Sequence, residues 1–169
     1  MISLRKADRN DRHIIKKMMM KFRNEYANTG AKIMDVDTPI EVTKGDISKG
    51  LVYMILSGKD IVGCVDVEYR TDIFTGEIVS TGEFITNLYI KPEYRNRNIA
   101  TTVRKLLEQH NVYGTNITAG RLVEKKDYWL EQGYTHYARD PREGRNDKHA
   151  LIRITKDPSK TPDYYWTKL

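Results

Sequence analysis

Hydrophobic and polar residues alternate along this chain with two different periods, and each period predicts one kind of element. In residues 12–28 the apolar side chains recur every three or four positions, as they do in an amphipathic helix. Residues 51–56 and 61–70 are instead rich in β-branched and aromatic side chains, and a short segment containing Gly58 joins them. This second pattern is typical of two strands in a hairpin.

The rest of the chain continues this succession of strands and helices. Strands are predicted at residues 2–5, 84–90, 116–119, 134–138 and 150–154, and helices at residues 39–49, 100–110 and 124–132. Residues 71–82 are predicted to be a loop or an irregular hairpin end, and the charged residues 139–149 a mobile connection. The order predicts an α/β (α+β) protein in which helices and strands are intermixed.

A chain of 169 residues is long enough to bury a substantial core in one domain, which we expect to span residues 1–155. Residues 156–169 form an aromatic tail with little helix or strand pattern. Its residues Tyr164, Tyr165 and Trp166 are too apolar to remain in water. We expect them to pack on the domain or on a second subunit, which would make the protein a homodimer.

Charge is concentrated near the N-terminus, although the whole chain carries a formal net charge of +6. Residues 1–30 hold eight Lys or Arg residues against three Asp or Glu residues. Such a basic face steers an anionic cofactor or acceptor, or touches RNA; the alternative is a solvated helix face. Aromatic residues are not interleaved with the basic ones as in a single-strand binding surface, so nucleic acid is not the expected partner.

Several function classes are excluded by the composition. No apolar run approaches the length of a membrane span, and the N-terminus lacks a signal-peptide pattern. Cys64 is the only cysteine and the four histidines are scattered, so neither a disulfide framework nor zinc-ligand spacing is present. We therefore expect a cytoplasmic protein with no metal and no membrane partner.

Residues 84–110 carry the clearest sign of chemistry. A hydrophobic strand ends before Pro92, and a loop with Arg95 and Arg97 leads into a helix that begins near Ala100. The first turn of a helix offers unpaired backbone N–H groups and a partial positive charge. Together with two arginines, these groups predict an anion site suited to a phosphate or pyrophosphate.

This segment resembles the acetyl-CoA-binding core of the GNAT acyltransferase superfamily. That family follows its strand with Val/Ile-x-Pro-x-x-Arg/Gln-x-x-Gly-x-Gly/Ala and a helix, and Ile90, Pro92, Arg95 and Ala100 match this pattern. Asn98 stands where the first glycine is usual. Asn accepts a positive φ angle better than other non-glycine residues, so we expect the turn to be kept, with a side chain at the point where the backbone approaches the pyrophosphate.

A second landmark supports the resemblance, because residues 128–134 are similar to the family's helix that ends in Tyr-x-x-x-Gly-Phe. Gly133 is predicted to be the left-handed helix cap and Tyr134 to open the next strand. The resemblance covers about residues 2–155. It implies a GNAT fold, with a mixed, mostly antiparallel twisted sheet of about seven strands, about four flanking helices, and a fourth and fifth strand that splay apart.

The resemblance also implies where acetyl-CoA binds. The pantetheine arm would lie between the splayed strands, and the loop and helix start would hold the pyrophosphate. The implied cofactor-binding residues are Leu88, Tyr89, Ile90, Arg95, Asn96, Arg97, Asn98, Ile99, Ala100 and Thr101. The backbone of the strand residues would pair with the pantetheine amides, while the arginine side chains would contact phosphate oxygens.

Acetyl transfer to an amine needs a group that takes the amine proton and a group that protonates the leaving thiolate. Glu83 is the first candidate for the base, directly or through water, and Asp66 and Glu68 are alternatives. The family often uses a tyrosine four residues before the glycine as the acid, but that position holds Trp129, whose indole is no proton source. Tyr128 takes this role only if the helix is rotated or irregular.

Other readings of these positions stay open. Leu122 replaces the asparagine frequent at the start of this helix in the family, and Trp129 packs against the pantetheine or closes off the acceptor site. Protonation then comes from solvent or from another tyrosine, or the protein binds acyl-CoA with little catalysis.

We predict an acetyl-CoA-dependent N-acetyltransferase acting on a primary amine of a small molecule or a protein. One alternative is a catalytically degenerate GNAT-fold protein with a binding or regulatory role. Another is an aminoacyl-tRNA acetyltransferase, which only the basic charge suggests.

Overall fold

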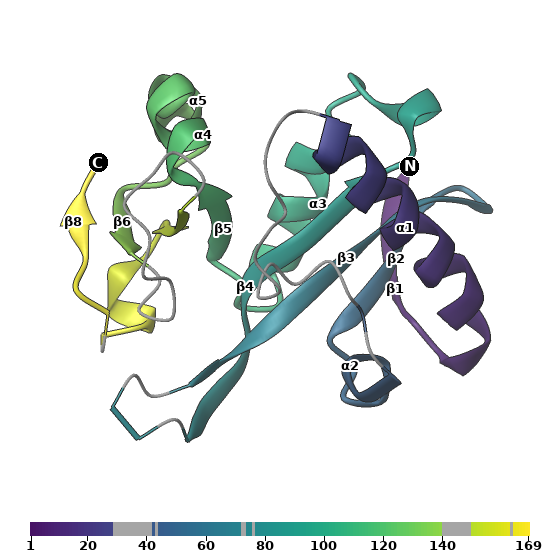
Figure 1. The fold of residues 1–169 in the computed structure, drawn as a ribbon, viewed down its shortest axis with the longest axis horizontal. Coiled ribbons are helices and arrows are strands. Elements are labelled where there is room, and N and C mark those ends of the chain that lie inside the picture. Colours follow the sequence, from purple (N-terminus) through teal and green to yellow (C-terminus); the bar gives the residue numbers. More distant parts are fainter. Residues whose placement is uncertain (29–41, 43, 72–73, 76, 140–149, 163) are drawn as a thin grey trace.

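One mixed sheet organises the fold (Figure 1). The computed structural model describes residues 1–28, 42, 44–71, 74–75, 77–139, 150–162 and 164–169. Within these ranges the sheet has eight strands in the order β1-β2-β3-β4-β5-β7-β6-β8. They are β1 (Ile2–Lys6), β2 (Val52–Ser57), β3 (Asp60–Thr71), β4 (Ile78–Ile90), β5 (Gly114–Thr118), β6 (His136–Arg139), β7 (Leu151–Thr155) and β8 (Thr167–Lys168). Neighbouring strands run antiparallel except β4 and β5, which are parallel.

The helices confirm most of the predicted positions and correct one. In the described residues they are α1 (Arg12–Asn28), α2 (Lys44–Ser48), α3 (Ile99–Glu108), α4 (Ala119–Glu124) and α5 (Lys126–Glu131). The helix predicted at residues 39–49 is present as α2, while residues 39–41 and 43 lie outside the described residues. The helix predicted at residues 124–132 is present as α5, but its start is corrected to Lys126, because the backbone breaks at Lys125 and separates α5 from α4, a helix that was not predicted.

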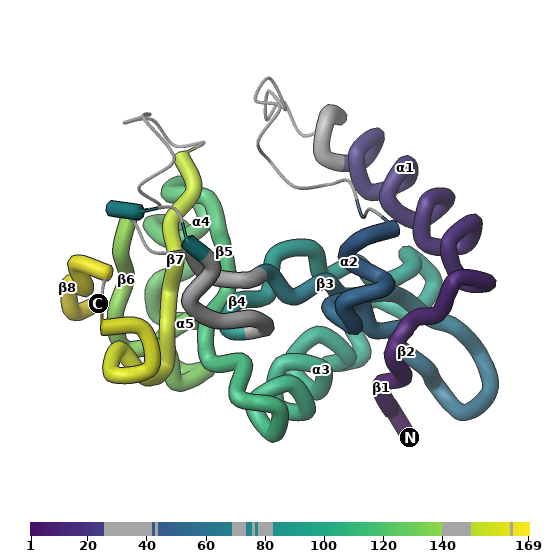
Figure 2. Tube along the Cα trace, turned by 90° about the horizontal axis from the view of Figure 1, so that it is seen from below, coloured from purple at the N-terminus to yellow at the C-terminus, as the bar shows by residue number. Residues whose placement is uncertain are grey.

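Two helical layers cover opposite faces of β1–β4 (Figures 1 and 2). The apolar face of α3 packs on one side, where Val103 and Leu107 are fully buried against Val65 and Ile55. On the other side α1 and α2 cover a second core that contains Met18, Met19, Ile47, Val52, Met54, Cys64 and Tyr89. The exposed basic residues of α1 point away from this core, which follows from the helical periodicity of its apolar side chains.

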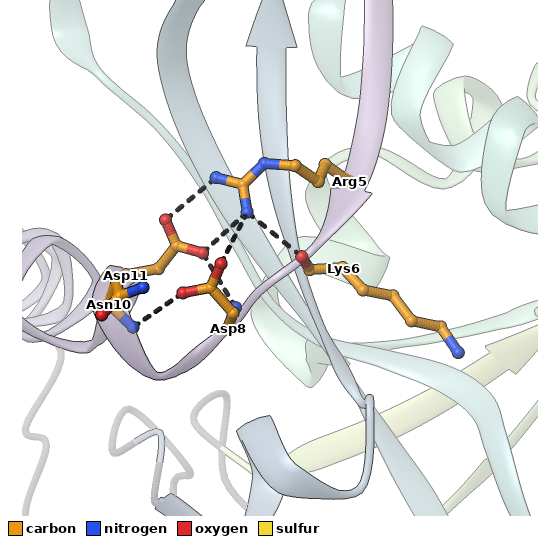
Figure 3. Close-up of polar contacts among 5 residues, drawn as sticks. All are labelled: Arg5, Lys6, Asp8, Asn10 and Asp11. Carbon is orange, nitrogen blue, oxygen red and sulfur yellow. Dashed lines mark hydrogen bonds and ion pairs between the residues drawn. The ribbon is translucent and has the colours of Figure 1, made fainter.

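The entry to α1 is fixed by an ion pair (Figure 3). Arg5 on β1 donates from both terminal nitrogens to the Asp11 carboxylate, at 2.8 and 2.9 Å. Asp11 in turn accepts from the backbone N–H of Asp8, and Asp8 caps the N–H of Asn10. The hydrogen bonds from Arg5 lower the pKa of Asp11, so this contact stabilises the ionised carboxylate.

The fourth strand is longer than predicted. It begins at Ile78, so the loop or irregular hairpin end expected at residues 71–82 is shorter, and Glu83 lies well inside the strand rather than at its start. Pairing with β3 extends as far as Thr71 and Ile78, and this long hairpin stands out in Figure 1. The strand β3 supplies the missing hydrogen-bond partners, which the weak hydrophobic pattern of this segment does not reveal.

The aromatic tail packs on the same sheet. Tyr164 is buried against Phe84 of β4, with ring centroids 5.7 Å apart, and Trp166 packs partly buried beside them. Thr167–Lys168 then adds β8 to the edge of β6. Tyr165 remains 80% exposed. Two of the three aromatic side chains are therefore covered within the chain, and the predicted homodimer stays a prediction.

Candidate active site

The strands β4 and β5 separate at the centre of the sheet. They pair only at Phe84 with Gly114 and at Ile85 with Thr115, where the Thr115 hydroxyl also donates to the Ile85 carbonyl at 3.3 Å. Directly after this point the register of β4 against β3 shifts, so that Thr86 is an extra residue. A bulge of this kind bends a strand and increases its twist. The bend turns β4 away from β5 and opens the sheet (Figure 1).

A cavity fills the space between the separated strands. It consists of two adjoining hollows of about 550 and 630 Å³. Both are lined by residues from α1, β4, the loop after it, α3, β5 and α5: Phe22, Thr86, Arg95, Ala100, Arg104, Asn116, Ile117 and Tyr128. The first hollow reaches the start of α3, and the second reaches α4 and β7. Together they connect the α3 side of the sheet with the α1 side.

The loop that ends at α3 has the predicted left-handed turn. Asn98 has φ 58° and precedes the first residue of α3, and Asn96 two positions earlier has φ 61°. Asn tolerates this conformation without the penalty of a branched side chain. The Asn98 carbonyl accepts from the Thr102 N–H and hydroxyl, so the backbone N–H groups before Thr102 remain available at the first hollow.

Backbone groups of β4 face the opening at alternate residues. The Lys91 N–H donates to the Val62 carbonyl of β3. In an antiparallel ladder the next residue directs its groups to the other side, so Leu88 and Ile90 face the cavity while Tyr89 faces β3. The Ile90 carbonyl accepts from Arg95 Nε at 2.8 Å. Of the three strand residues predicted to pair with a pantetheine arm, Leu88 has the backbone best placed for it.

Arg95 holds α1 rather than pointing freely toward a phosphate. Its Nη2 atom lies 2.6 Å from the Glu25 carboxylate, and its guanidinium lies over the Tyr89 ring at 5.5 Å. The Tyr89 hydroxyl donates to the same carboxylate at 3.2 Å. This contact fixes the end of α1 at the cavity, and the predicted charge-assisted contact of Arg95 with a phosphate stays a prediction. Arg97 is exposed beside Tyr94.

The break at Lys125 decides which aromatic residue reaches the cavity. Tyr128 lines both hollows, and its hydroxyl accepts from Arg104 Nη1 at 3.4 Å. Trp129 is buried, packs edge-on against Tyr134, and reaches only the second hollow. The irregular helix needed for Tyr128 to face the site is therefore present. Sequence alone could not show it, since Lys125 carries no helix-breaking signal.

The end of α5 confirms the predicted glycine cap, whereas the next strand, β6, begins at His136 and not at Tyr134 as predicted. Gly133 has φ 91°, the left-handed conformation that glycine adopts without steric cost. The Gly133 N–H donates to the Leu130 carbonyl and the Tyr134 N–H to the Trp129 carbonyl, which is the Schellman arrangement. Leu122 packs partly buried against this core.

Asp66 is the acidic group with the most strongly raised pKa in the described residues, and its strand partner Asn87 lines the second hollow. It is 7% exposed on β3, opposite Asn87 of β4. Burial is the main cause that raises the pKa of Asp66 to about 8, and the charges of Asp46 and Glu68 add to it. The Asn87 amide has a smaller effect in the opposite direction. Glu68 forms an ion pair with the buried Arg153.

Glu83, the first candidate for the base, is half-buried on β4 before the strands separate. It lies outside the described lining of the cavity. Its catalytic role therefore stays a prediction, and the lining of the cavity does not separate it from Asp66, which lies outside that lining as well.

Several polar atoms around the second hollow lack partners. Among the described residues, buried atoms without a hydrogen bond include Thr86 Oγ1, Asn87 Nδ2, Arg104 Nε, Asn116 Oδ1 and Trp129 Nε1. Buried polar groups are nearly always hydrogen-bonded, so such a concentration at one cavity is typical of a site whose polar ligand completes the bonds. Sequence analysis missed Asn87 and Asn116, although asparagine is uncommon in strands and marks both positions.

Two kinds of feature are absent from the described part of the chain. No group of three or more His, Cys, Asp or Glu residues is arranged to hold a metal ion there. No helix in the same ranges has both the length and the apolar character needed to cross a membrane.

Comparison with known proteins identifies the fold. No family model matches the sequence, and no curated protein matches it either. Solved structures do match. A GNAT-family acetyltransferase from Streptococcus agalactiae is 19% identical, with a TM-score of 0.65 over 92% of this chain and 96% of that one.

Two other solved structures are similar over nearly their whole length. A GNAT-family acetyltransferase from Listeria monocytogenes has a TM-score of 0.60 at 12% identity, over 90% of this chain and 93% of that one. A PaiA N-acetyltransferase from Thermoplasma acidophilum, solved with coenzyme A, has a TM-score of 0.54 at 15% identity, over 93% and 99%. With its separated β4 and β5 and the helix that begins beside them, this chain has the fold of the GNAT acetyltransferase superfamily.

Proposed function

We propose that this protein is an acetyl-CoA-dependent N-acetyltransferase that acts on a primary amine. The observation that carries the proposal is the bulge-driven separation of β4 and β5 beside the first turn of α3, with a cavity between them. A thioester carrier needs a slot for an extended arm and a cradle for a diphosphate, and these two features stand next to each other here.

The first turn of α3 supports binding of the diphosphate. Ile99, Ala100 and Thr101 precede the first intrahelical N–H donor, so their N–H groups suit phosphate oxygens, and the positive end of the helix dipole adds to the attraction. Asn98 is among the residues that line the first hollow. The extended arm would lie along β4 and pair with the backbone of Leu88.

Tyr128 and Asp66 are the groups that we assign to proton transfer. Bound acetyl-CoA supplies the thioester carbonyl that the amine attacks. As the C–N bond forms and the C–S bond breaks, the amine proton passes through water to the Asp66 carboxylate. The leaving thiolate takes the Tyr128 hydroxyl proton. A carboxylate with a raised pKa is the stronger base for an ammonium group whose ordinary pKa is about 10.4.

Two measurements on the purified protein test the proposal. Acetyl-CoA is expected to raise the melting temperature, because a ligand that binds only the folded state stabilises it. Primary amines from a panel of alkylamines, diamines and lysine peptides are expected to accelerate release of free thiol from acetyl-CoA. Absence of any thermal shift would remove the proposal. Binding without amine-dependent thiol release would instead favour a protein that holds acyl-CoA without turnover.

A further inference from the structure

Two asparagines stand on either side of the opening and face the α1 side of the sheet. Asn87 follows the bulge on β4, and Tyr89 two positions later packs against Phe22 of α1 with ring centroids 5.7 Å apart. Asn116 on β5 directly follows the last residue paired with β4. Its neighbour Ile117 packs into the core under α5, so the Asn116 side chain points to the opposite face.

Both side chains present an unpaired atom to the same hollow. Asn87 is 2% exposed and Asn116 is half-buried. Neither Asn87 Nδ2 nor Asn116 Oδ1 makes a hydrogen bond of ordinary geometry in the described part of the chain, although the Asn87 amide lies close enough to Asp66 to favour its ionised form. Leaving a buried donor or acceptor unsatisfied costs about 1–3 kcal/mol, so a ligand that pairs with both recovers this cost. The pair therefore lowers the stability of the free protein and favours an occupied site.

The two atoms differ in character, and this difference selects the ligand. Asn87 Nδ2 donates, so it suits a carbonyl oxygen. Asn116 Oδ1 accepts, so it suits an N–H group. A carboxylate or phosphate would leave the Asn116 oxygen unpaired and would hold its charge beside the Asp66 carboxyl, which lies opposite Asn87 on β3 and ionises as the pH rises. When an amine attacks a thioester, the amine has an N–H group for Asn116 and the thioester has a carbonyl oxygen for Asn87.

We propose that Asn87 and Asn116 clamp the reacting groups from the acceptor side of the opening. Asn116 Oδ1 accepts an N–H of the incoming amine and orients its lone pair. Asn87 Nδ2 donates to the carbonyl oxygen, which gains negative charge as the amine attacks. The acceptor then enters between α1 and β7, opposite α3. This inference rests on the proposed function and adds the two residues that select an amine.

Isosteric leucine variants separate the two roles. Loss of a donor to an oxyanion costs about 10²–10³ in kcat, so Asn87→Leu is expected to lower kcat by this factor with little change in the affinity for acetyl-CoA. Asn116→Leu is expected to raise the KM for the amine about tenfold, and Asn116→Asp, which keeps an acceptor oxygen, to restore it. Asn10→Leu, at an exposed position in the 3-10 turn that precedes α1, is the matched control.

The outcomes distinguish this inference from the proposed function. Acetyl-CoA affinity is measured by calorimetry for each variant. If the unmodified protein does not bind acetyl-CoA, the proposed function fails. If it binds and turns over, but Asn87→Leu keeps its kcat or Asn116→Asp behaves like Asn116→Leu, only the clamp is wrong.

A second measurement tests the clamp if the protein binds acetyl-CoA but shows no measurable turnover. The side-chain amide signals of Asn87 and Asn116, assigned in ¹H–¹⁵N spectra from the leucine variants, are followed while butylamine is added to the CoA-saturated protein. Both signals are expected to shift, and that of Asn10 to stay in place. Unchanged signals of both asparagines at saturating amine would overturn the clamp.

Discussion

Asp66→Asn tests the buried carboxyl that we assign as the base, and its effect on stability has a defined sign. Asp66 is buried on β3, and its burial and then the charges of Asp46 of α2 and Glu68 of its own strand oppose its ionisation. The Asn87 amide and the Val67 backbone N–H favour the ionised form, but their effect is smaller. The folded protein therefore holds the Asp66 proton more tightly than the unfolded chain does.

The magnitude follows from the pKa in the two states. The carboxyl has an ordinary pKa of 3.8, and the folded structure raises the pKa of Asp66 to about 8. At 1.36 kcal/mol for each unit of pH, this difference corresponds to at most about 6 kcal/mol. Its contribution to stability is complete below pH 4 and is lost as the pH rises to 8. Entry of water around the ionised carboxylate reduces the loss, so about 2–6 kcal/mol is expected.

Urea unfolding of the two proteins between pH 5 and pH 9 measures this effect. The free energy of unfolding of the unmodified protein is expected to fall relative to Asp66→Asn as the pH rises, and to level off above pH 8. Asp46→Asn is the control, because removal of that charge moves the midpoint to lower pH. A stability difference that stays constant from pH 5 to pH 9 would refute an elevated pKa of Asp66.

Four other changes have expected outcomes. Arg95→Ala breaks a partly exposed ion pair and is expected to lower the free energy of unfolding by about 0.2–1 kcal/mol in urea titrations, and to weaken acetyl-CoA binding in calorimetry. Tyr128→Phe is expected to lower kcat for thiol release by about 10²–10⁴ without loss of acetyl-CoA affinity. Asp11→Asn is expected to remove the stability that the unmodified protein loses below pH 4, seen in acid unfolding followed by circular dichroism. Gly114→Ala would place a Cβ 2.4 Å from the Phe84 ring and is expected to cost about 1–3 kcal/mol in thermal unfolding.

Each of these four predictions has a contrary result. Arg97→Ala, at an exposed position in the same loop, is expected to leave stability unchanged, and equal effects of the two arginine variants would contradict the Arg95–Glu25 contact. An unchanged kcat in Tyr128→Phe would move the acid elsewhere. An Asp11→Asn protein with the acid transition of the unmodified one, or a Gly114→Ala protein of full stability, would show that the respective contact contributes little.

The hydrophobic pattern of the sequence predicted the helices and strands whose apolar faces pack on the sheet. The bounds of the other elements depend on pairing with strands distant in the sequence. The periodicity of α1 and the strand, proline and helix around Pro92 were readable because each depends on residues close in sequence. The start of β4 at Ile78 was not readable, since β3 rather than its own residues stabilises it.

The backbone conformation of the candidate site could be predicted from the sequence. The directions in which its side chains point could not. The left-handed conformation of Asn98 followed from its residue type and position. The contact of Arg95 with Glu25 joins residues 70 positions apart, and no local pattern encodes it. The cavity-facing position of Tyr128 likewise depends on a helix break that only the packing of α4 and α5 against the sheet produces.

Calorimetric titration with acetyl-CoA tests most directly whether the opening between β4 and β5 is a thioester site. The unmodified protein is expected to bind one molecule per chain, with CoA as a competitor. Ala100→Glu, which adds a negative charge at the first turn of α3, is expected to weaken binding at least tenfold. Gln109→Glu adds the same charge at the other end of α3 and is expected to leave binding intact. Absence of binding, or equal affinity in Ala100→Glu, would contradict the assignment.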